Sequence, residues 1–253
     1  MGDLHSGHKV GLTPPKFWGG SDPQSSLRAT LWKEFAAKIQ EIQPIDTVIV
    51  NGDCIDGRGE RSGSTELITV SQIEQTRIAA EAINFVGAKN VLITRGTPYH
   101  TGKDEDYEDL VGDLTNAVTV SDQVWPSING VVLDCKHHIS GSGIPHGRAT
   151  AIGKARLWNI VHNAFAESQP KADVIVRSHV HYYQHIDGGD WMGFVLPALQ
   201  GLGSKFGSKI CEGLVHFGFV WLDIEDRESW IREPKCNRWI LTGGPQKKSA
   251  LIL

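Results

Sequence analysis

The sequence predicts a layered α/β fold. Helix and strand patterns alternate along residues 25–176, and short strand patterns joined by glycine-rich turns follow residue 181. Such alternation is typical of parallel strands covered by helices, whereas the later run indicates antiparallel pairing. A length of 253 residues is sufficient to bury a large core. We expect one domain over residues 1–242 and, over residues 243–253, a mobile tail or contact arm without helix or strand period.

The first half of the chain provides helices and buried strands in turn. Apolar Leu27, Leu31, Phe35 and Ile39 recur every four residues and predict a helix over residues 25–43, which Pro44 ends. The patterns that follow predict a strand at 46–50, a helix at 69–86, a strand at 89–94 and a short helix that opens in the acidic stretch 104–109. We expect the carboxylates of that stretch to favour a helix N-terminus rather than to bind metal.

The second half begins in the same way and then changes. A strand at 131–133, a long helix at 149–168 and a strand at 173–176 continue the alternation. Three further strand patterns follow at 182–186, 191–196 and 216–224. The segment 6–24, rich in glycine, proline and histidine, is predicted to be an ordered loop because it contains a large apolar side chain, Trp18.

Composition limits the classes of function. The net charge of −4 does not favour avid, non-specific binding to long nucleic acid. No apolar run reaches membrane-spanning length, and the N-terminus lacks a signal-peptide pattern, so we expect a cytoplasmic protein without a membrane partner. Cys54, Cys135, Cys211 and Cys236 are widely spaced and form no CxxC pair, which indicates small buried thiols in a reducing compartment.

Residues that can bind metal gather at the ends of the predicted strands. The chain opens with a D-x-H element, and in an extended segment its two side chains face the same point. Later clusters contain Asp53 and Asp56, then His100, then His137 and His138, and finally His179 and His181. Because ligands of layered α/β folds bind outside the carboxyl ends of strands, these clusters are expected to converge.

The ligand types indicate a divalent cation. Imidazoles and carboxylates without thiolates suit Mn²⁺, Fe²⁺ or Zn²⁺. Asp53 is the natural bridge between two cations because its two oxygens carry separate lone pairs. Two cations about 3.5–4 Å apart can hold a phosphoryl oxygen and acidify water for in-line attack on phosphorus.

The order of these elements resembles the calcineurin-like metallophosphoesterase family. D-x-H, G-D-x-x-D-G, a glycine-to-histidine element, a lone strand-end histidine and S-H-x-H follow one another between residues 3 and 181. The resemblance implies a four-layer αββα double β-sandwich with a two-metal site at the strand ends. Segments 11–15 and 61–63 further resemble phage-encoded members, which would place the protein in the host cytoplasm.

The resemblance also implies roles for individual residues. Asp3, His5 and His181 would bind the first cation, His137 and His179 the second, and Asp53 both. Mn²⁺ is the expected metal, with Fe²⁺, Zn²⁺ and Ni²⁺ as alternatives. The family pattern favours His137 over its neighbour His138 as the ligand. Asp56, Thr97 and His138 would lie outside the ligand set, and Asp56 would orient a ligand or cap its loop.

Three departures from the family pattern stand out. The third element reads Gly96-Thr97-Pro98-Tyr99-His100 where the family has an asparagine followed directly by histidine. His100 is expected either to protonate the leaving group or to reach the metal. Only two residues precede Asp3, so either neighbouring contacts hold this end or a preceding strand is missing; Ser178 replaces a glycine and requires a tolerable backbone angle.

Substrate and function follow as hypotheses. Arg58, Arg61 and Arg148 lie in loops after the clusters and are candidates for phosphate binding, although a solvated surface arginine explains each equally well. The first hypothesis is a dinuclear phosphodiesterase acting on a nucleotide or nucleic-acid end. Alternatives are a phosphomonoesterase with the same site and a degenerate binding or assembly module. A metallo-β-lactamase-like hydrolase would need H-x-H-x-D-H, which the chain lacks; the oligomeric state is left open.

Overall fold

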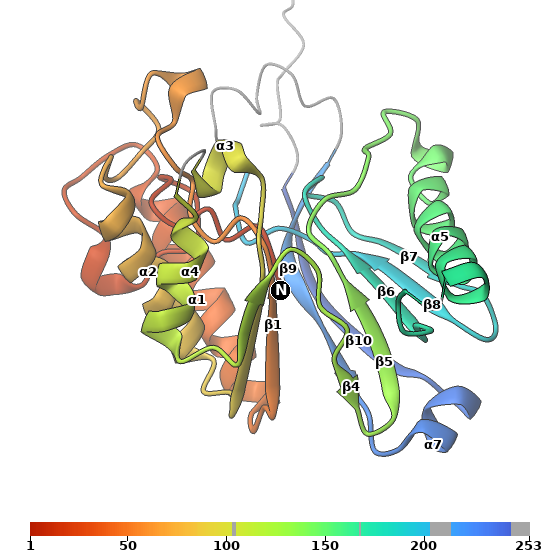
Figure 1. Ribbon diagram of the computed structural model, residues 1–253. Coiled ribbons are helices and arrows are strands. Elements are labelled where there is room, and N and C mark those ends of the chain that lie inside the picture. Colours follow the sequence, from red (N-terminus) through yellow and green to blue (C-terminus); the bar gives the residue numbers. More distant parts are fainter. Residues whose placement is uncertain (103–104, 167, 203–213, 244–253) are drawn as a thin grey trace, which may run out of the picture.

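The chain forms four layers, with helices outside and β-sheets inside. Figure 1 shows the computed structural model, which describes residues 1–102, 105–166, 168–202 and 214–243. In that view, helices on one side cover the first sheet, the two sheets face each other, and α5 covers the far side of the second. This layering is the one expected from the resemblance.

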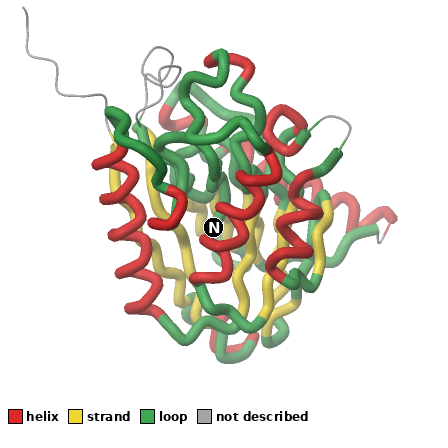
Figure 2. Tube along the Cα trace, turned by 90° about the vertical axis from the view of Figure 1, so that its left-hand side faces the viewer, coloured by secondary structure: helices red, strands yellow, loops and turns green. Residues whose placement is uncertain are grey.

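The first sheet contains three parallel strands in the order β1-β2-β3. Its strands are β1 (Thr47–Asn51), β2 (Asn90–Thr94) and β3 (Thr119–Ser121). The helices that pack with it are α1 (Ser25–Ile42), α2 (Gln72–Phe85) and α4 (Tyr107–Thr115). Figure 2, viewed from the helical side, shows these helices in front of the strands. Short helical turns η1 (Pro15–Phe17), η2 (Glu60–Ser62) and α3 (Pro98–Thr101) lie in the loops.

The second sheet has five strands in the order β4-β5-β6-β8-β7. They are β4 (Ser127–Ile128), β5 (Val131–Cys135), β6 (Val174–Arg177), β7 (Gln184–Asp187) and β8 (Met192–Val195). The central strands β5, β6 and β8 run parallel, and the outer pairs β4–β5 and β7–β8 are antiparallel. The turn η3 (Pro145–Gly147) precedes α5 (Thr150–Ala166), the helix that covers this sheet.

A hairpin of β9 (Val215–Asp223) and β10 (Lys235–Gly243), with α7 (Arg227–Arg232) between them, completes the structure. Two segments outside the named strands, around Ala198 and at the start of the chain, connect this hairpin to the first sheet. The amide of Ala198 donates to the carbonyl of His216 at 2.9 Å, and the amide of Leu199 donates to the carbonyl of Gly2 at 3.2 Å. The amide of Asn51 in turn donates to Met1 at 2.8 Å, so the start of the chain lies between the hairpin and β1.

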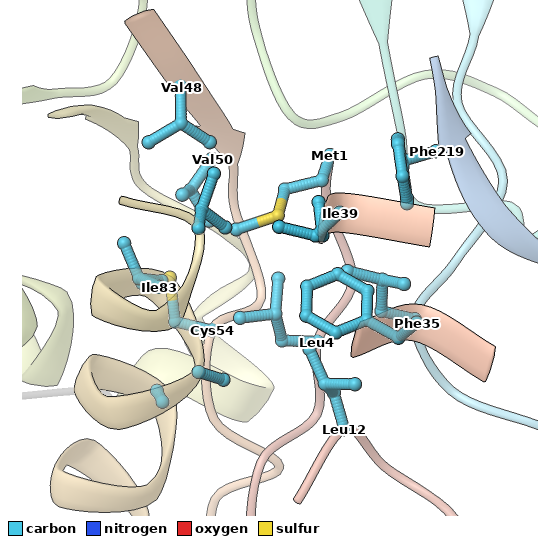
Figure 3. Packing of buried hydrophobic residues seen from close by; sticks show 14 of the residues in the cluster. Met1, Leu4, Leu12, Phe35, Ile39, Val48, Val50, Cys54, Ile83 and Phe219 are labelled. Atoms are coloured by element: carbon cyan, nitrogen blue, oxygen red, sulfur yellow. The ribbon is translucent and has the colours of Figure 1, made fainter. Parts of the chain in front are cut away.

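Among the residues that the structure describes, the alternation of side chains along the strands produces three cores. Phe35, Val50 and Phe219 pack between the helices and the first sheet, as Figure 3 shows for this cluster. A second cluster, including Val174 and Val176 of β6, fills the space between the sheets. The intervening Ile175 points to the opposite face and packs with Ile152 of α5, in a third cluster that includes Val195. Three cores between four layers are what period-two strands require.

Most predicted elements are confirmed, with shifts at their ends. The second helix begins at Gln72, where Ser71 caps it, rather than at residue 69, and the strand predicted at 182–186 begins at Gln184. Within the described residues, the elements that were not predicted are α3, β3, β4, α7, β10 and the short turns η1, η2 and η3. Strand β10 extends to Gly243, the first residue of the predicted tail, and residues 244–253 lie outside the described part.

Cys54 and Cys135 are buried free thiols as expected, Cys236 is half-buried, and Cys211 lies outside the described residues. None of the helices in the described ranges combines the length and apolar character that a bilayer crossing requires.

Candidate metal centre

The start of the chain runs beside β1 and places the D-x-H side chains at its carboxyl end. The amide of Asp3 donates to the carbonyl of Gly52 at 2.9 Å, and the amide of His5 donates to the carbonyl of Asp53 at 3.0 Å. From the other side, the amide of Leu199 donates to the backbone carbonyl of Asp3 at 3.0 Å. These contacts hold the backbone of Asp3 between β1 and the segment that contains Leu199.

Asn51, the last residue of β1, ties the strand ends of both sheets together. Its side-chain nitrogen donates to Ser178 Oγ at 2.8 Å and to the carbonyl of Lys136 at 3.1 Å, and its side-chain oxygen accepts from Thr94 at 2.9 Å. The sequence interpretation gave Asn51 no role because its partners lie 43 to 127 residues away. Ser178, a departure from the family pattern, provides one of these contacts without a positive φ.

The first group of potential ligands is Asp3, His5 and His181. The Nε2 atoms of His5 and His181 are 3.1 Å apart, and His181 Nε2 is 3.4 Å from Asp3 Oδ1. Asp56 Oδ1 lies 3.0 Å from His5 Nδ1 and fixes the orientation of this ring. The Nε2 lone pair of His5 is therefore directed toward the other two residues.

The second group is Asp53, His137 and His179. Asp53 Oδ2 lies 3.1 Å from His137 Nε2. His137 Nδ1 lies 2.8 Å from the carbonyl of Asn51, an acceptor, so Nδ1 carries the proton and Nε2 faces Asp53. The two groups adjoin, because the amide of His179 donates to Asp3 Oδ2 at 3.1 Å.

Two buried atoms support a cation here. Asp3 Oδ1 and His137 Nε2 are buried and have no hydrogen-bond partner among the described residues. His137 Nε2 faces the Asp53 carboxylate at 3.1 Å, where the protonated ring forms an ion pair without the alignment of a hydrogen bond. Buried polar atoms without partners are costly, and a divalent cation would satisfy both. The donor set of imidazole nitrogens and carboxylate oxygens fits such an ion.

Five of the six expected ligands adopt a left-handed backbone. The φ angles are 51° for Asp3, 45° for His5, 52° for Asp53, 79° for His179 and 54° for His181. For residues other than glycine this region costs on the order of 1–3 kcal/mol each, and such residues cluster at functional sites. The left-handed backbone directs these side chains toward one region at the strand ends. The alternation of side chains along a strand does not predict this common direction.

The electrostatics divide the histidines into two kinds. Burial opposes the charged form of His137, but Asp53 raises the pKa of this ring to about 10. Asp3 likewise raises the pKa of His181 against the effect of burial. Burial, with His100 and His181 nearby, holds the pKa of His5 well below its usual range. Burial would raise the pKa of Asp53, yet His137 keeps it below its usual value.

His100 lies at the edge of the first group and forms a third one with His5 and Asp56. The rings of His5 and His100 meet edge to face, with centroids 4.5 Å apart. His100 Nδ1 lies 2.8 Å from the carbonyl of Asp56, so Nδ1 carries a proton and Nε2 is left for proton transfer. The structure therefore brings His100 to the site despite the two extra residues before it.

Thr97 does not present its side chain as a free ligand. Its amide donates to Asp53 Oδ1 at 2.7 Å, and its hydroxyl lies 3.2 Å from the same oxygen. Thr97 therefore holds the carboxylate of Asp53 through its amide and its hydroxyl. His138 is exposed and belongs to none of the described ligand groups, although its ring lies 4.8 Å from that of His179.

The three candidate arginines differ in their surroundings. Arg61 lies over the ring of Tyr99, 4.7 Å from its centroid, and Tyr99 directly precedes His100 in the chain. Arg148 lies over the ring of Tyr182, 4.3 Å from its centroid, and Tyr182 directly follows His181 in the chain. Arg58 is exposed and donates to Gln72 at 3.2 Å. Arg61 and Arg148 are thus held on tyrosines adjacent in sequence to site histidines.

Glu108 is buried and makes contacts that its place in the acidic stretch does not indicate. The prediction for the acidic stretch 104–109 is confirmed as a helix start, since Asp106 caps α4. Glu108 itself is fully buried and accepts hydrogen bonds from the amides of Cys54 at 2.9 Å and Gly96 at 2.5 Å. Burial and the neighbouring Asp53 raise the pKa of Glu108 to about 8.

Comparisons with known proteins found structural likeness only. No protein-family model matches the sequence, and no curated protein matches it. Among solved structures, an archaeal phosphodiesterase has 13% identity and a TM-score of 0.47, covering 95% of this chain and 97% of that one. Vps29 of Chaetomium thermophilum has 11% identity and a TM-score of 0.45, with 97% and 95% covered. Zinc-bound Vps29 of Entamoeba histolytica has 14% identity and a TM-score of 0.39, with 94% and 96% covered.

Proposed function

We propose that this protein is a phosphoesterase that uses two divalent cations to hydrolyse a phosphodiester, such as a nucleotide or a nucleic-acid end. The observation that carries the proposal is the pair of adjoining ligand groups, joined by the 3.1 Å hydrogen bond between His179 and Asp3. Asp3, His5 and His181 would hold one cation, His137 and His179 the other, and Asp53 both. When bound, the cations supply Lewis acidity toward a phosphoryl oxygen and toward the attacking water.

The chain's own groups have three further tasks. His100, with its Nδ1 proton on the carbonyl of Asp56, is placed to deliver a proton from Nε2 to the leaving alkoxide. Asp56 keeps the ring of His5 in one orientation. Arg61 and Arg148 are the candidates for holding substrate phosphate, and their stacking on tyrosines limits their motion.

Hydrolysis of two model esters tests this proposal. We expect the metal-stripped protein supplied with Mn²⁺ to hydrolyse bis-p-nitrophenyl phosphate faster than p-nitrophenyl phosphate, and a chelator to abolish both activities. Faster turnover of the monoester would favour the phosphomonoesterase alternative. If neither ester reacts with Mn²⁺, Fe²⁺, Zn²⁺ or Ni²⁺, the protein is not this kind of hydrolase.

One observation favours the non-catalytic alternative. Thr97 stands where the family has an asparagine ligand, and both its amide and its hydroxyl turn to Asp53. The second group therefore has three side-chain donors among the described residues. A protein that binds one cation tightly, the second weakly, and hydrolyses no ester would fit a binding or assembly module.

Cation binding is expected to release protons. In the metal-free protein the pKa of His137 is raised to about 10, so its ring is protonated at pH 7 and must lose the Nε2 proton to bind metal. Apparent affinity for Mn²⁺ should therefore rise about tenfold per pH unit between pH 6 and 8 for each proton displaced. Calorimetry in two buffers of different ionisation enthalpy measures the number of protons.

The matched control for proton release is His162→Ala, on α5 and away from the site. This variant should release as many protons as the wild type, because His162 contacts Trp158 and Ser168 and not the ligand groups. If the observed binding enthalpy does not depend on the buffer, Mn²⁺ binding displaces no proton from His137.

A further inference from the structure

A buried carboxyl group joins two loops of the candidate metal centre from behind. Glu108, in the first turn of α4, accepts hydrogen bonds from the amides of Cys54 and Gly96 with its two different oxygens. Cys54 directly follows Asp53, and Gly96 directly precedes Thr97. The carboxyl therefore spans the loop after β1 and the loop after β2 and holds both by their backbones.

These loops approach each other closely at Asp53. A Cβ atom added to Gly96 would lie 2.1 Å from Asp53 Oδ1 and 2.3 Å from the amide nitrogen of Asp53, so only glycine fits there. The amide of Thr97 donates to the same carboxylate oxygen at 2.7 Å. A small displacement of either loop would therefore move or turn the Asp53 carboxylate.

The helix that carries Glu108 is itself anchored to this region. Arg95, the residue before Gly96, forms ion pairs with Asp106 at 3.0 Å and with Asp109 at 2.6 Å. Asp106 also accepts a hydrogen bond from the amide of Glu108 at 3.2 Å. The first turn of α4 is thus fixed to the end of β2 by Arg95 outside and Glu108 inside.

A general helix-terminus role does not explain Glu108. A carboxylate can stabilise a helix N-terminus from the surface, as Asp109 in the same turn does with a side chain 54% exposed. Glu108 is fully buried, and burying a carboxyl group is costly unless its oxygens are used. Both oxygens are used, on the two loops that flank Asp53.

We propose that Glu108 is a positioning residue that fixes the separation of these loops and so aims the Asp53 carboxylate at the bound cations. This role rests on the proposed function, because it matters only if Asp53 binds metal. Glu108 itself touches neither cation nor substrate; it acts through the backbones of Cys54 and Gly96.

The test measures Mn²⁺ binding by calorimetry on metal-stripped wild type, Glu108→Ala and Glu108→Gln. We expect Glu108→Ala to bind Mn²⁺ about tenfold more weakly, in line with the loss of a group that supports a ligand. Glu108→Gln keeps the size and one acceptor oxygen, so its affinity should fall between the two, and it carries the test if the alanine variant does not fold. Amide exchange of Cys54 and Gly96 should accelerate in Glu108→Ala, and exchange of one of the two amides should accelerate in Glu108→Gln.

Asn159→Ala is the matched control for a buried polar residue that joins two backbone segments. Asn159 is 1% exposed and bonds to Ala172 and Pro170, far from the ligand groups in the fold. Its loss should lower the melting temperature and leave Mn²⁺ affinity unchanged. Equal Mn²⁺ affinity of wild type and folded Glu108 variants would overturn the role of Glu108 alone. A wild type that binds no Mn²⁺ would overturn the proposed function and this role with it.

Discussion

Replacing Asp53 with asparagine is expected to lower kcat/KM for a phosphodiester by about a thousandfold or more while the protein remains folded. Asparagine keeps the size of the side chain and can still accept a hydrogen bond from the amide of Thr97. It removes the negative charge that Asp53 places 3.1 Å from His137 Nε2. One neutral oxygen cannot replace a carboxylate shared by two cations, so occupancy of both positions should fall.

The pKa of His137 provides a second readout for this variant. Asp53 is the neighbour that raises this pKa to about 10, so in metal-free Asp53→Asn the ring should titrate nearer its ordinary range. A ring whose pKa is higher in the folded than in the unfolded state stabilises the folded protein at pH values below that raised pKa. The variant lacks this effect, so it should lose stability at neutral pH relative to the metal-free wild type. Titration of the His137 ring by NMR would follow this change directly.

A buried aspartate at the other end of β6 is the control for Asp53→Asn. Asp173 accepts a hydrogen bond from the amide of Val132 at 3.0 Å and pairs with Arg227 at 2.8 Å, before the strand rather than after it. Asp173→Asn should reduce stability but retain the activity of the remaining folded protein. Full activity in Asp53→Asn would show that this carboxylate holds no essential cation.

The second large effect is expected from His100→Ala and should depend on the leaving group. A general acid contributes about 10²–10⁴-fold when the leaving alkoxide is basic and little when it is a good leaving group. We therefore expect a loss of about 10²-fold or more for an alkyl ester, and less than about tenfold for a p-nitrophenyl ester. Measuring both esters under the same Mn²⁺ concentration separates the two cases.

Metal binding distinguishes this role from ligation. His100 belongs to the group with His5 and Asp56 but to neither of the two groups joined at Asp3 and His179. Mn²⁺ affinity should accordingly change little in His100→Ala. Equal slowing of both esters together with weaker Mn²⁺ binding would mean that His100 reaches the metal, which is the alternative that the sequence leaves open.

The sequence predicted the arrangement of the site better than its details. Asp53, His137 and His179 each follow a strand with a readable apolar pattern, and the carboxyl ends of parallel strands meet in space. The choice of His137 over His138 came from the family pattern. In the structure, His137 Nδ1 contacts the carbonyl of Asn51, 86 residues away, and this contact orients the ring toward Asp53.

Other features depend on contacts that local sequence does not encode. The position of Glu108 in the first turn of a helix explains an acidic residue there but does not reveal that it bonds to Cys54 and Gly96. The left-handed φ angles at Asp3 and His181 are imposed by tertiary contacts on residues that would not choose them. Strands β3 and β4, of three and two residues, are too short to show a period.

Metal content tests the central claim most directly: that distant loops meet to hold two cations with Asp53 shared between them. Protein dialysed against Mn²⁺ and freed of excess would be analysed by elemental mass spectrometry, with Asp53→Asn and Asp173→Asn in parallel. The account predicts two Mn²⁺ ions per wild-type and Asp173→Asn chain and fewer than one in Asp53→Asn. Equal metal content in all three proteins, or none in the wild type, would contradict it.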